Sequence, residues 1–127
     1  MKVSPFYLTR PVGQTNQDWF LNAAALIETA LTPQSLLKIL LMTEREMGRV
    51  RGAKWGPRLI DLDLLFFDQA VIEEEGLKIP HPYLNKRRFV LLPLTDIAPK
   101  WIHPVLKQTP GEMLANLTKD GQEAIRL

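Results

Sequence analysis

The sequence predicts one domain of the α+β class, and three observations lead to this expectation. Its 127 residues are enough for a single hydrophobic core. Residues 32–48 have the apolar spacing of an amphipathic helix. Several short apolar runs, the strongest at residues 59–67, have the length and composition of strands. No internal repeat and no linker divides the chain, so we expect a single domain over residues 1–127.

The segments before the helix are short. Residues 1–7 are strand-like, and residues 9–18 contain enough proline, glycine, asparagine and aspartate to form a loop. Residues 20–29 are ambiguous, because their alanines favour a helix whereas ten residues between turns also suit a buried strand.

The helix at residues 32–48 has recognisable ends. Thr32 can cap it, Pro33 suits the first helical position, and Gly48 can end it. One face follows the i, i+3, i+4, i+7 spacing, with Leu37, Leu40, Leu41 and Glu44. Glu44 thus interrupts an apolar stripe. It is either a carboxylate at the rim of the core, held by a neighbouring arginine, or a functional residue.

The middle of the chain combines a basic loop with an apolar strand. Residues 48–57 hold three glycines, a proline and three basic residues, which predicts a mobile loop. Residues 59–67 follow as a central strand. The pair at 68–69 would turn this strand into a hairpin with residues 70–72.

The remaining elements are a strand and two helices. Residues 77–80 suit a short strand, and the apolar residues 89–97 suit the start of a helix. From residue 99 the chain reads as a loop followed by a last short helix.

Composition excludes several classes of protein. Hydrophobic residues make up 46% of the chain and charged residues 24%, as in ordinary globular proteins. There is no cysteine, hence no disulfide framework and no thiolate metal site. The chain has neither an apolar run long enough to span a membrane nor the regions of a signal peptide. We expect a cytoplasmic location.

The net charge of +2 says less than its distribution. Residues 45–58 contain a single acidic side chain, Glu46, against five basic ones, which are Arg45, Arg49, Arg51, Lys54 and Arg58. A second basic group occupies residues 86–88, while three glutamates at 73–75 balance the total. Basic groups on both sides of an aspartate pair suit a multiply charged anion together with a divalent cation.

Asp61 and Asp63 are the aspartate pair, in an otherwise apolar run. On a strand they would share one face, with Cα atoms roughly 7 Å apart. At an effective dielectric constant of about 20, two carboxylates about 6 Å apart repel by roughly 2–3 kcal/mol. Mg²⁺ commonly takes one or two carboxylates together with substrate phosphates, and would offset this repulsion. Arg49, Arg51 and Arg58 would neutralise the same phosphate oxygens.

Two other interpretations of these residues stay open. The aspartates can lie at a solvated sheet edge beside structural arginines. The basic segment can also bind RNA or DNA. Against this, it has no stacking aromatic beyond Trp55, and Asp61 and Asp63 would repel phosphates in the absence of metal.

The motif around the aspartates is more specific than the pair alone. The string RVRGAKWGPRLIDLDLLFFD closely resembles the identifying motif of the 6-hydroxymethyl-7,8-dihydropterin pyrophosphokinases, a family of folate-pathway enzymes. In that motif W-G-P-R precedes D-[apolar]-D at this spacing. The resemblance extends to FYLTRPVG, DWFLNAA and GRVRG, and to IPHPYLNKRRFVLLPLTDIAP and HPVL later in the chain. It covers nearly the whole sequence.

The resemblance implies transfer of pyrophosphate from ATP to the hydroxymethyl group of the pterin, with release of AMP. It implies that Asp61 and Asp63 hold two Mg²⁺ ions that bridge the phosphates and the acceptor hydroxyl. Arg49 and Arg58 match the family's phosphate-binding arginines and belong, with the aspartates, to the expected catalytic set. Other residues match positions at or near the nucleotide or on the loop that closes over the reactants, namely Glu44, Arg51, Trp55, His81 and Arg87.

For the pterin, the resemblance implies that Phe20 and Phe89 stack on the two faces of the flat ring. Asn22 matches an asparagine that hydrogen-bonds the polar edge of the ring, with backbone groups near Thr9 and Val12 assisting. The segment containing Phe20 is a strand in the family, which puts Phe20 and Asn22 on one face. We therefore adopt a strand there, against its helical propensity.

The expected chemistry is mainly positioning and charge neutralisation, as in other phosphoryl-type transfers. The acceptor hydroxyl would lose its proton to water or a nearby carboxylate, and no side chain offers itself as a covalent nucleophile. His103 also precedes a proline, and we expect it to be a structural residue of the C-terminal loop. The expected partners are ATP and the pterin, with no nucleic acid and no membrane.

The implied fold is a ferredoxin-like layered α/β/α sandwich around a mainly antiparallel sheet. Family members begin with a strand carrying a G-S-N-[LM]-G-like turn, followed by a helix, and this βα unit of about thirty residues has no counterpart here. Three explanations stay open. The chain is a fragment of an ordinary enzyme, a shortened and catalytically inactive module that still binds nucleotide or pterin, or a chain whose missing strand comes from a partner. Unless a partner strand completes the sheet, we expect a monomer.

Overall fold

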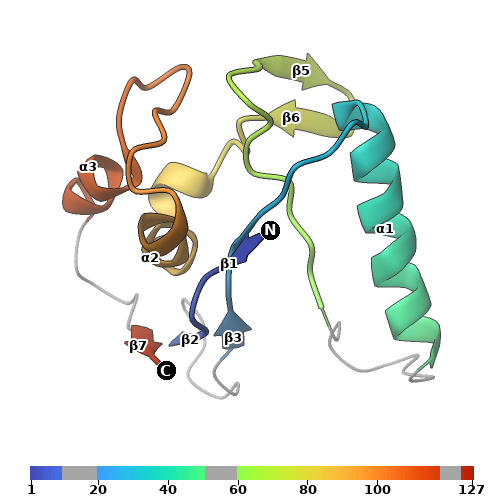
Figure 1. The fold of residues 1–127 in the computed structure, drawn as a ribbon, viewed down its shortest axis with the longest axis horizontal. Helices are drawn as coiled ribbons and strands as arrows, with labels where there is room; N and C mark the ends of the chain where they lie inside the picture. Colours follow the sequence, from blue (N-terminus) through green and yellow to red (C-terminus); the bar gives the residue numbers. More distant parts are fainter. Residues whose placement is uncertain (10–19, 51–59, 118–123) are drawn as a thin grey trace. The chain divides into compact units, whose positions relative to one another are not determined.

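The computed structural model describes residues 1–9, 20–50, 60–117 and 124–127. The chain divides into two units, each of which is considered by itself. The first unit comprises Met1–Glu28 and Pro82–Leu127, and the second comprises Thr29–His81. Each contains α-helix and antiparallel strands, so the predicted α+β class is confirmed for the described residues (Figure 1).

In the first unit, two segments at the start of the chain pair with each other in an antiparallel sense. β1 (Lys2–Val3) pairs with β4 (Ala25–Leu26), and β2 (Tyr7–Thr9) pairs with β3 (Phe20–Asn22). The predicted strand at residues 1–7 therefore exists in two pieces. The ambiguous segment at residues 20–29 is a pair of short strands, as the family resemblance required.

Ser4 bridges the interruption between β1 and β2. Its backbone N–H donates to the Ala24 carbonyl at 2.8 Å, and its hydroxyl accepts from the Ala24 N–H at 2.9 Å. Pro5 follows, and it has no N–H to donate to a ladder. The break in the strand is therefore local, and the buried Ser4 keeps the two segments together across it.

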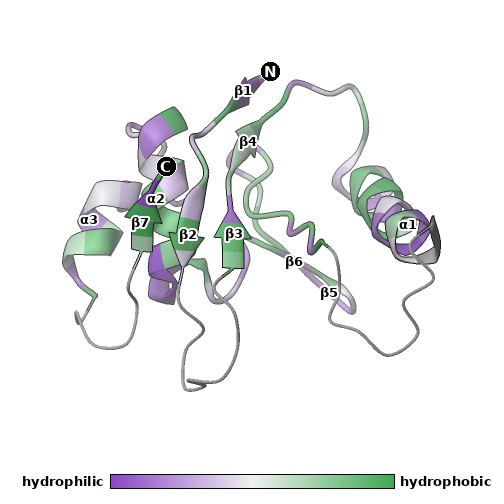
Figure 2. Cartoon of the chain, turned by 90° about the horizontal axis from the view of Figure 1, so that it is seen from below, coloured by the Kyte–Doolittle hydropathy of each residue, from purple (hydrophilic) through white to green (hydrophobic). Residues whose placement is uncertain are grey.

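A third strand, β7 (Ala124–Arg126), pairs with the other edge of β2 to give the order β3-β2-β7 (Figure 2). The sequence did not predict this strand. Three residues are too few to show a period of two, so their extended conformation depends on β2, more than a hundred residues earlier in the sequence.

The helices of the first unit are α2 (Arg88–Ile97) and α3 (Pro110–Ala115), with a short 3₁₀ helix, η1 (Leu84–Lys86), before them. Both α-helices confirm predicted segments. Their apolar side chains form the core of this unit with one strand residue, and its most buried apolar members include Tyr7, Leu84, Leu91, Leu94 and Met113.

The second unit is built on α1 (Pro33–Val50). Thr32 caps it as predicted, because its hydroxyl accepts a hydrogen bond from the Ser35 N–H at 3.1 Å. The predicted end at Gly48 is wrong, since the helix continues to Val50; an interior glycine costs only about 1 kcal/mol relative to alanine. None of the described helices is long and apolar enough to cross a lipid bilayer.

The inward face of α1 differs by one position from the predicted stripe. Leu36 is 7% exposed, whereas Leu41 is 50% exposed. Leu37, Leu40 and Glu44 are half-buried, as predicted. Leu41 fits the i+4 spacing from Leu37, but it lies at the margin of the apolar face, and packing of the unit selects Leu36 instead.

A hairpin follows in the same unit, formed by β5 (Ile72–Glu74) and β6 (Leu77–Ile79). Its turn includes Gly76, whose φ of 82° suits glycine. The predicted strand at residues 77–80 is confirmed. The predicted hairpin between residues 59–67 and 70–72 is wrong, because Ile72 pairs with Ile79.

Residues 60–67 do not form the predicted central strand. A strand needs a neighbouring strand to complete its ladder, and no described segment supplies one here. Instead, the Leu62 N–H donates to a side chain of α1, and the Leu65 carbonyl accepts from the His81 N–H at 2.9 Å. The predicted alternation of faces is present only from Ile60 to Leu64, because Leu65 and Phe67 are half-buried like Phe66.

Candidate active site

Asp61 and Asp63 are both exposed, and the residues that alternate with them are half-buried, namely Ile60, Leu62 and Leu64. This period of two is typical of an extended chain. The two carboxylates therefore share the solvent-exposed side of the segment, as predicted. Exposed aspartate oxygens are the type of ligand that Mg²⁺ prefers. The pair therefore fits a hard cation that takes its other ligands from substrate or water.

Glu44 contacts this segment directly. Its Oε2 accepts a hydrogen bond from the Leu62 N–H at 2.5 Å. The sequence left open that an arginine holds Glu44 at the rim of the core, but no arginine appears among the described contacts of Glu44. The described contact is with the backbone N–H of Leu62, which lies between the two aspartates. One such bond leaves acceptor capacity in the carboxylate, which has about four lone-pair sites.

His81 approaches the same segment from the end of the β5–β6 hairpin. Its backbone N–H donates to the Leu65 carbonyl at 2.9 Å. The second unit thus brings together three parts of the predicted site, since Glu44 and His81 each bond to the segment that carries Asp61 and Asp63. The helix binds the segment at Leu62 and the hairpin binds it at Leu65, so the two hydrogen bonds lie on either side of Asp63 in the sequence.

The first unit holds the residues expected at the pterin. In the antiparallel register, Thr9 pairs with Phe20 and Tyr7 pairs with Asn22. Cross-strand partners share a face, so Phe20 and Asn22 lie on one face together with Thr9, as predicted. The Asn22 Nδ2 donates to the Thr9 Oγ1 at 2.5 Å. This bond orients the amide, and 51% exposure leaves the Phe20 ring accessible.

Phe89 lies in the first turn of α2, and α2 contacts the strand β3 that carries Phe20 and Asn22. Arg87 immediately precedes the helix. Its guanidinium carbon lies 5.5 Å from the centre of the Tyr83 ring and 5.7 Å from that of the Phe89 ring. These distances are within cation–π range. Arg87 is thus held beside an aromatic ring of the expected pterin site.

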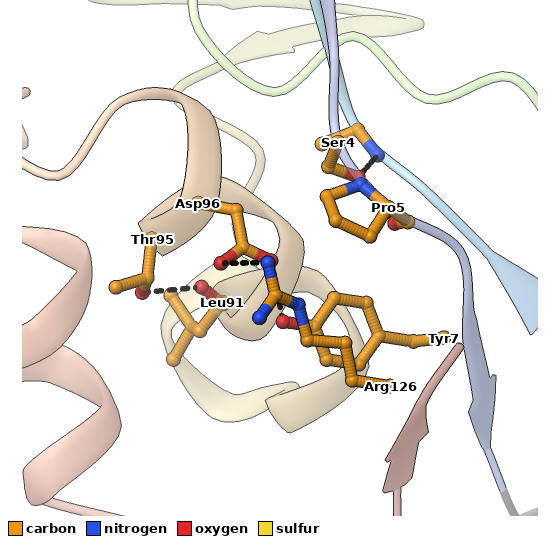
Figure 3. Close-up of polar contacts among 8 residues, drawn as sticks. Ser4, Pro5, Tyr7, Leu91, Thr95, Asp96 and Arg126 are labelled. Atoms are coloured by element: carbon orange, nitrogen blue, oxygen red, sulfur yellow. Dashed lines mark hydrogen bonds and ion pairs between the residues drawn. The ribbon is translucent and has the colours of Figure 1, made fainter.

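A polar network fastens the strands of the first unit to α2 (Figure 3). The Tyr7 hydroxyl donates to Asp96 Oδ2 at 2.5 Å, and Arg126 lies 3.7 Å from Asp96 Oδ1. Burial, and then the hydrogen bond to Asp96, raise the pKa of Tyr7 above its ordinary value. Tyr7 and Arg126 are neighbours on β2 and β7, so this network connects both strands to the helix that carries Phe89.

Several predicted residues lie outside the described part of the chain. They are Val12, Arg51, Trp55 and Arg58, together with the loop expected at residues 9–18 beyond Thr9. Arg49 lies within α1, but its side chain also falls outside the description. The roles expected for these residues stay predictions.

Two candidate residues escaped the sequence analysis. Tyr83 was not considered, although an aromatic residue four positions before an arginine is a spacing at which side chains meet on a helical turn. The Leu62 amide had no detectable signal, because every residue other than proline carries the same backbone N–H.

Comparison with known proteins identifies the family of the chain. Residues 1–99 match the family described as 7,8-dihydro-6-hydroxymethylpterin-pyrophosphokinase (HPPK). This match covers most of the chain and includes every predicted site residue. The chain belongs to the HPPK family.

Individual relatives support the HPPK assignment. A 2-amino-4-hydroxy-6-hydroxymethyldihydropteridine pyrophosphokinase of Methylorubrum extorquens is 46% identical over 119 residues, which is 94% of this chain and 74% of the relative. One from Pseudomonas aeruginosa is 42% identical over 97% of this chain and 75% of its own length. The folic acid synthesis protein FOL1 of Dictyostelium discoideum is 44% identical over 91% of this chain, which spans only 18% of that protein.

Proposed function

We propose that this chain transfers pyrophosphate from ATP to the hydroxymethyl group of 6-hydroxymethyl-7,8-dihydropterin, in folate biosynthesis. The observation that carries the proposal is the shared exposure of Asp61 and Asp63 on one side of their segment, in a chain of the HPPK family. The pterin hydroxyl oxygen bonds to the β-phosphorus of ATP, and the bond from that phosphorus to the oxygen bridging the α-phosphate breaks. AMP leaves, and the hydroxyl proton passes to water or a nearby carboxylate.

Asp61 and Asp63 are the proposed holders of two Mg²⁺ ions. The cations would supply charge neutralisation at the phosphates and at the acceptor oxygen. Around them, basic side chains would bind and orient the nucleotide phosphates, and the proposed set is Arg49, Arg51, Arg58, His81 and Arg87. Glu44 and Trp55 complete the proposed nucleotide site. Positioning and charge neutralisation would provide most of the rate enhancement, as in other phosphoryl-type transfers.

The pterin would be bound by residues of the first unit. Phe20 and Phe89 are the proposed stacking partners of the ring, and offset stacking favours a flat heterocycle. Asn22 would hydrogen-bond its polar edge, because a carboxamide offers both a donor and an acceptor. Backbone groups at Thr9 and Val12 would assist. The bond between Asn22 and Thr9 supports this assignment, since it fixes one polar group before the ligand arrives.

For the architecture, we propose that residues 1–127 act as one pyrophosphokinase domain with ferredoxin-like layering around its antiparallel strands. We also propose that the chain acts as a monomer. Sedimentation or light scattering of the purified chain at micromolar concentration would test the monomer directly.

The decisive test of the function is AMP release by the purified chain with ATP, Mg²⁺ and 6-hydroxymethyl-7,8-dihydropterin. We expect AMP whose formation requires the pterin. ATP consumption that does not depend on the pterin would argue against this acceptor. A folded chain that binds the pterin without releasing AMP would instead be the inactive binding module that the sequence analysis left open.

A further inference from the structure

The side chain of Glu44 reaches from α1 to the peptide that lies between the two aspartates. Its Oε2 accepts from the Leu62 N–H at 2.5 Å. We propose that Glu44 is a positioning residue, which fixes the direction of Asp61 and Asp63 through the Leu62 amide. This proposal rests on the proposed function, because it concerns the same metal site.

Residues 60–67 need the hydrogen bond to Glu44 because they lack the hydrogen bonds that a neighbouring strand would normally provide. In a sheet, the Leu62 N–H would donate to a carbonyl of the neighbouring strand, but no described segment forms a ladder with residues 60–67. The Glu44 carboxylate accepts that hydrogen bond instead. A charged acceptor makes a stronger bond than a neutral carbonyl, so a single contact from the helix can hold the peptide.

The position of the bond matters for the aspartates. The Leu62 side chain is half-buried, while Asp61 and Asp63 are exposed. The Leu62 peptide sits directly between the two carboxylate-bearing residues, so rotation there would change the direction of both side chains. Mg²⁺ demands near-ideal octahedral geometry, and groups that orient metal ligands commonly change metal affinity by about 10- to 100-fold when removed.

The chain offers a matched set of variants. Glu44→Gln keeps an oxygen acceptor but removes the charge, while Glu44→Met keeps similar length and helix propensity but removes the acceptor. Both variants change the charge equally, so any difference between them isolates the hydrogen bond. Glu46→Gln is the control for charge, because Glu46 is exposed on the same helix and no site role is assigned to it.

Two measurements on the full chain separate positioning from simple structural support. The first is hydrogen exchange of the Leu62 amide by NMR without metal or substrate. The second is the dissociation constant for Mn²⁺, a paramagnetic stand-in for Mg²⁺, from water-proton relaxation. We expect Glu44→Met to exchange the Leu62 amide about tenfold faster and to bind Mn²⁺ about tenfold more weakly than the unaltered chain. In both the exchange rate and the Mn²⁺ affinity, Glu44→Gln should fall between Glu44→Met and the unaltered chain. Glu46→Gln should match the unaltered chain.

Unchanged exchange of the Leu62 amide in Glu44→Met would overturn the proposal. So would faster exchange with unchanged Mn²⁺ affinity, because Glu44 would then stabilise the segment without positioning its ligands. Equal Mn²⁺ affinities of Glu44→Gln and Glu44→Met would likewise contradict it. Failure of the proposed function would be seen separately, in the unaltered chain. If the unaltered chain did not bind Mn²⁺, both the metal site and this proposal would be wrong. If it bound Mn²⁺ but had no activity with the pterin, amide exchange and Mn²⁺ affinity would still test the role of Glu44.

Discussion

At the scale of single residues, Asp61 and Asp63 carry the charge on which the proposed reaction depends. We expect Asp61→Asn or Asp63→Asn to lower kcat by about 10²-fold or more, because a neutral amide neutralises a bound cation poorly. The dissociation constant for the pterin should change little, since the pterin residues belong to other segments. AMP release and pterin fluorescence titration would measure the two effects.

The matched control for these variants is Asp68→Asn, an equivalent change at an exposed aspartate of the 68–69 turn. Asparagine tolerates the positive φ of 49° found at Asp68, so this variant should keep its fold. Normal turnover in Asp61→Asn, or an equal loss in Asp68→Asn, would contradict the metal assignment.

A second prediction at the scale of residues concerns Tyr83, whose ring centre lies 5.5 Å from the guanidinium carbon of Arg87. A cation–π contact at an exposed site contributes about 0.5–1 kcal/mol, and Tyr83 is 56% exposed. If Arg87 binds the nucleotide phosphates, Tyr83→Leu should raise the KM for ATP by about 2- to 5-fold with little effect on kcat. Tyr83→Phe keeps the ring and should behave normally. A KM for ATP that is the same in all three proteins would show that the stacking is irrelevant to the nucleotide.

At the scale of elements, α3 shows how much a short helix depends on its cap. Thr109 and Glu112 form a capping box: the Glu112 N–H donates to the Thr109 hydroxyl at 3.2 Å, and the Thr109 N–H donates to the Glu112 carboxylate at 2.9 Å. A helix of only six residues has little stability of its own. The cap and the buried Met113 therefore decide whether it forms.

Thr109→Ala should accordingly lower the free energy of unfolding by about 1 kcal/mol, measured by urea denaturation. Thr109→Ser retains the accepting oxygen and should lose much less. Equal stability of the alanine variant and the unaltered chain would mean that the box does not hold α3 in solution.

At the scale of the whole molecule, stability should depend on pH through His103. This residue is buried, and its Nδ1 accepts from the Val105 N–H at 3.1 Å and the Leu106 N–H at 3.0 Å. Burial lowers the pKa of His103 below its ordinary value. The structural role expected for His103 in the C-terminal loop is thus confirmed, because an unprotonated Nδ1 organises the turn.

The sign of the effect follows from linkage. Because the folded pKa is lowered, the unfolded chain binds this proton more readily than the folded chain does. The stability that His103 contributes is present above its unfolded pKa of about 6.5, and is lost as pH falls toward the folded value. The free energy of unfolding should therefore decrease from pH 7 to pH 5.5, more steeply than in His103→Asn, which offers an oxygen in place of Nδ1. Parallel pH profiles of the two proteins would refute this assignment.

The chain as a whole also shows which predictions local sequence can support. The start of α1 at Thr32 and Pro33 was predictable, because a cap and its helix are neighbours in sequence. The common face of Phe20 and Asn22 followed once the segment was taken as a strand. Its assignment as a strand did not follow from local propensity, since the alanines favour a helix; it came from the family resemblance.

What the sequence determined by itself was the family motif, the alternation around Asp61 and Asp63, and the capped start of α1, since each depends on residues close together in the chain. The tertiary structure alone decided three other features: that residues 60–67 bond to Glu44 and His81 rather than to a strand, that Ile72 pairs with Ile79, and that residues 124–126 join β2. The physical reason is that every residue other than proline carries the same backbone N–H donor and C=O acceptor. Which of them meet is settled by packing of distant segments, and this leaves no mark on the local sequence.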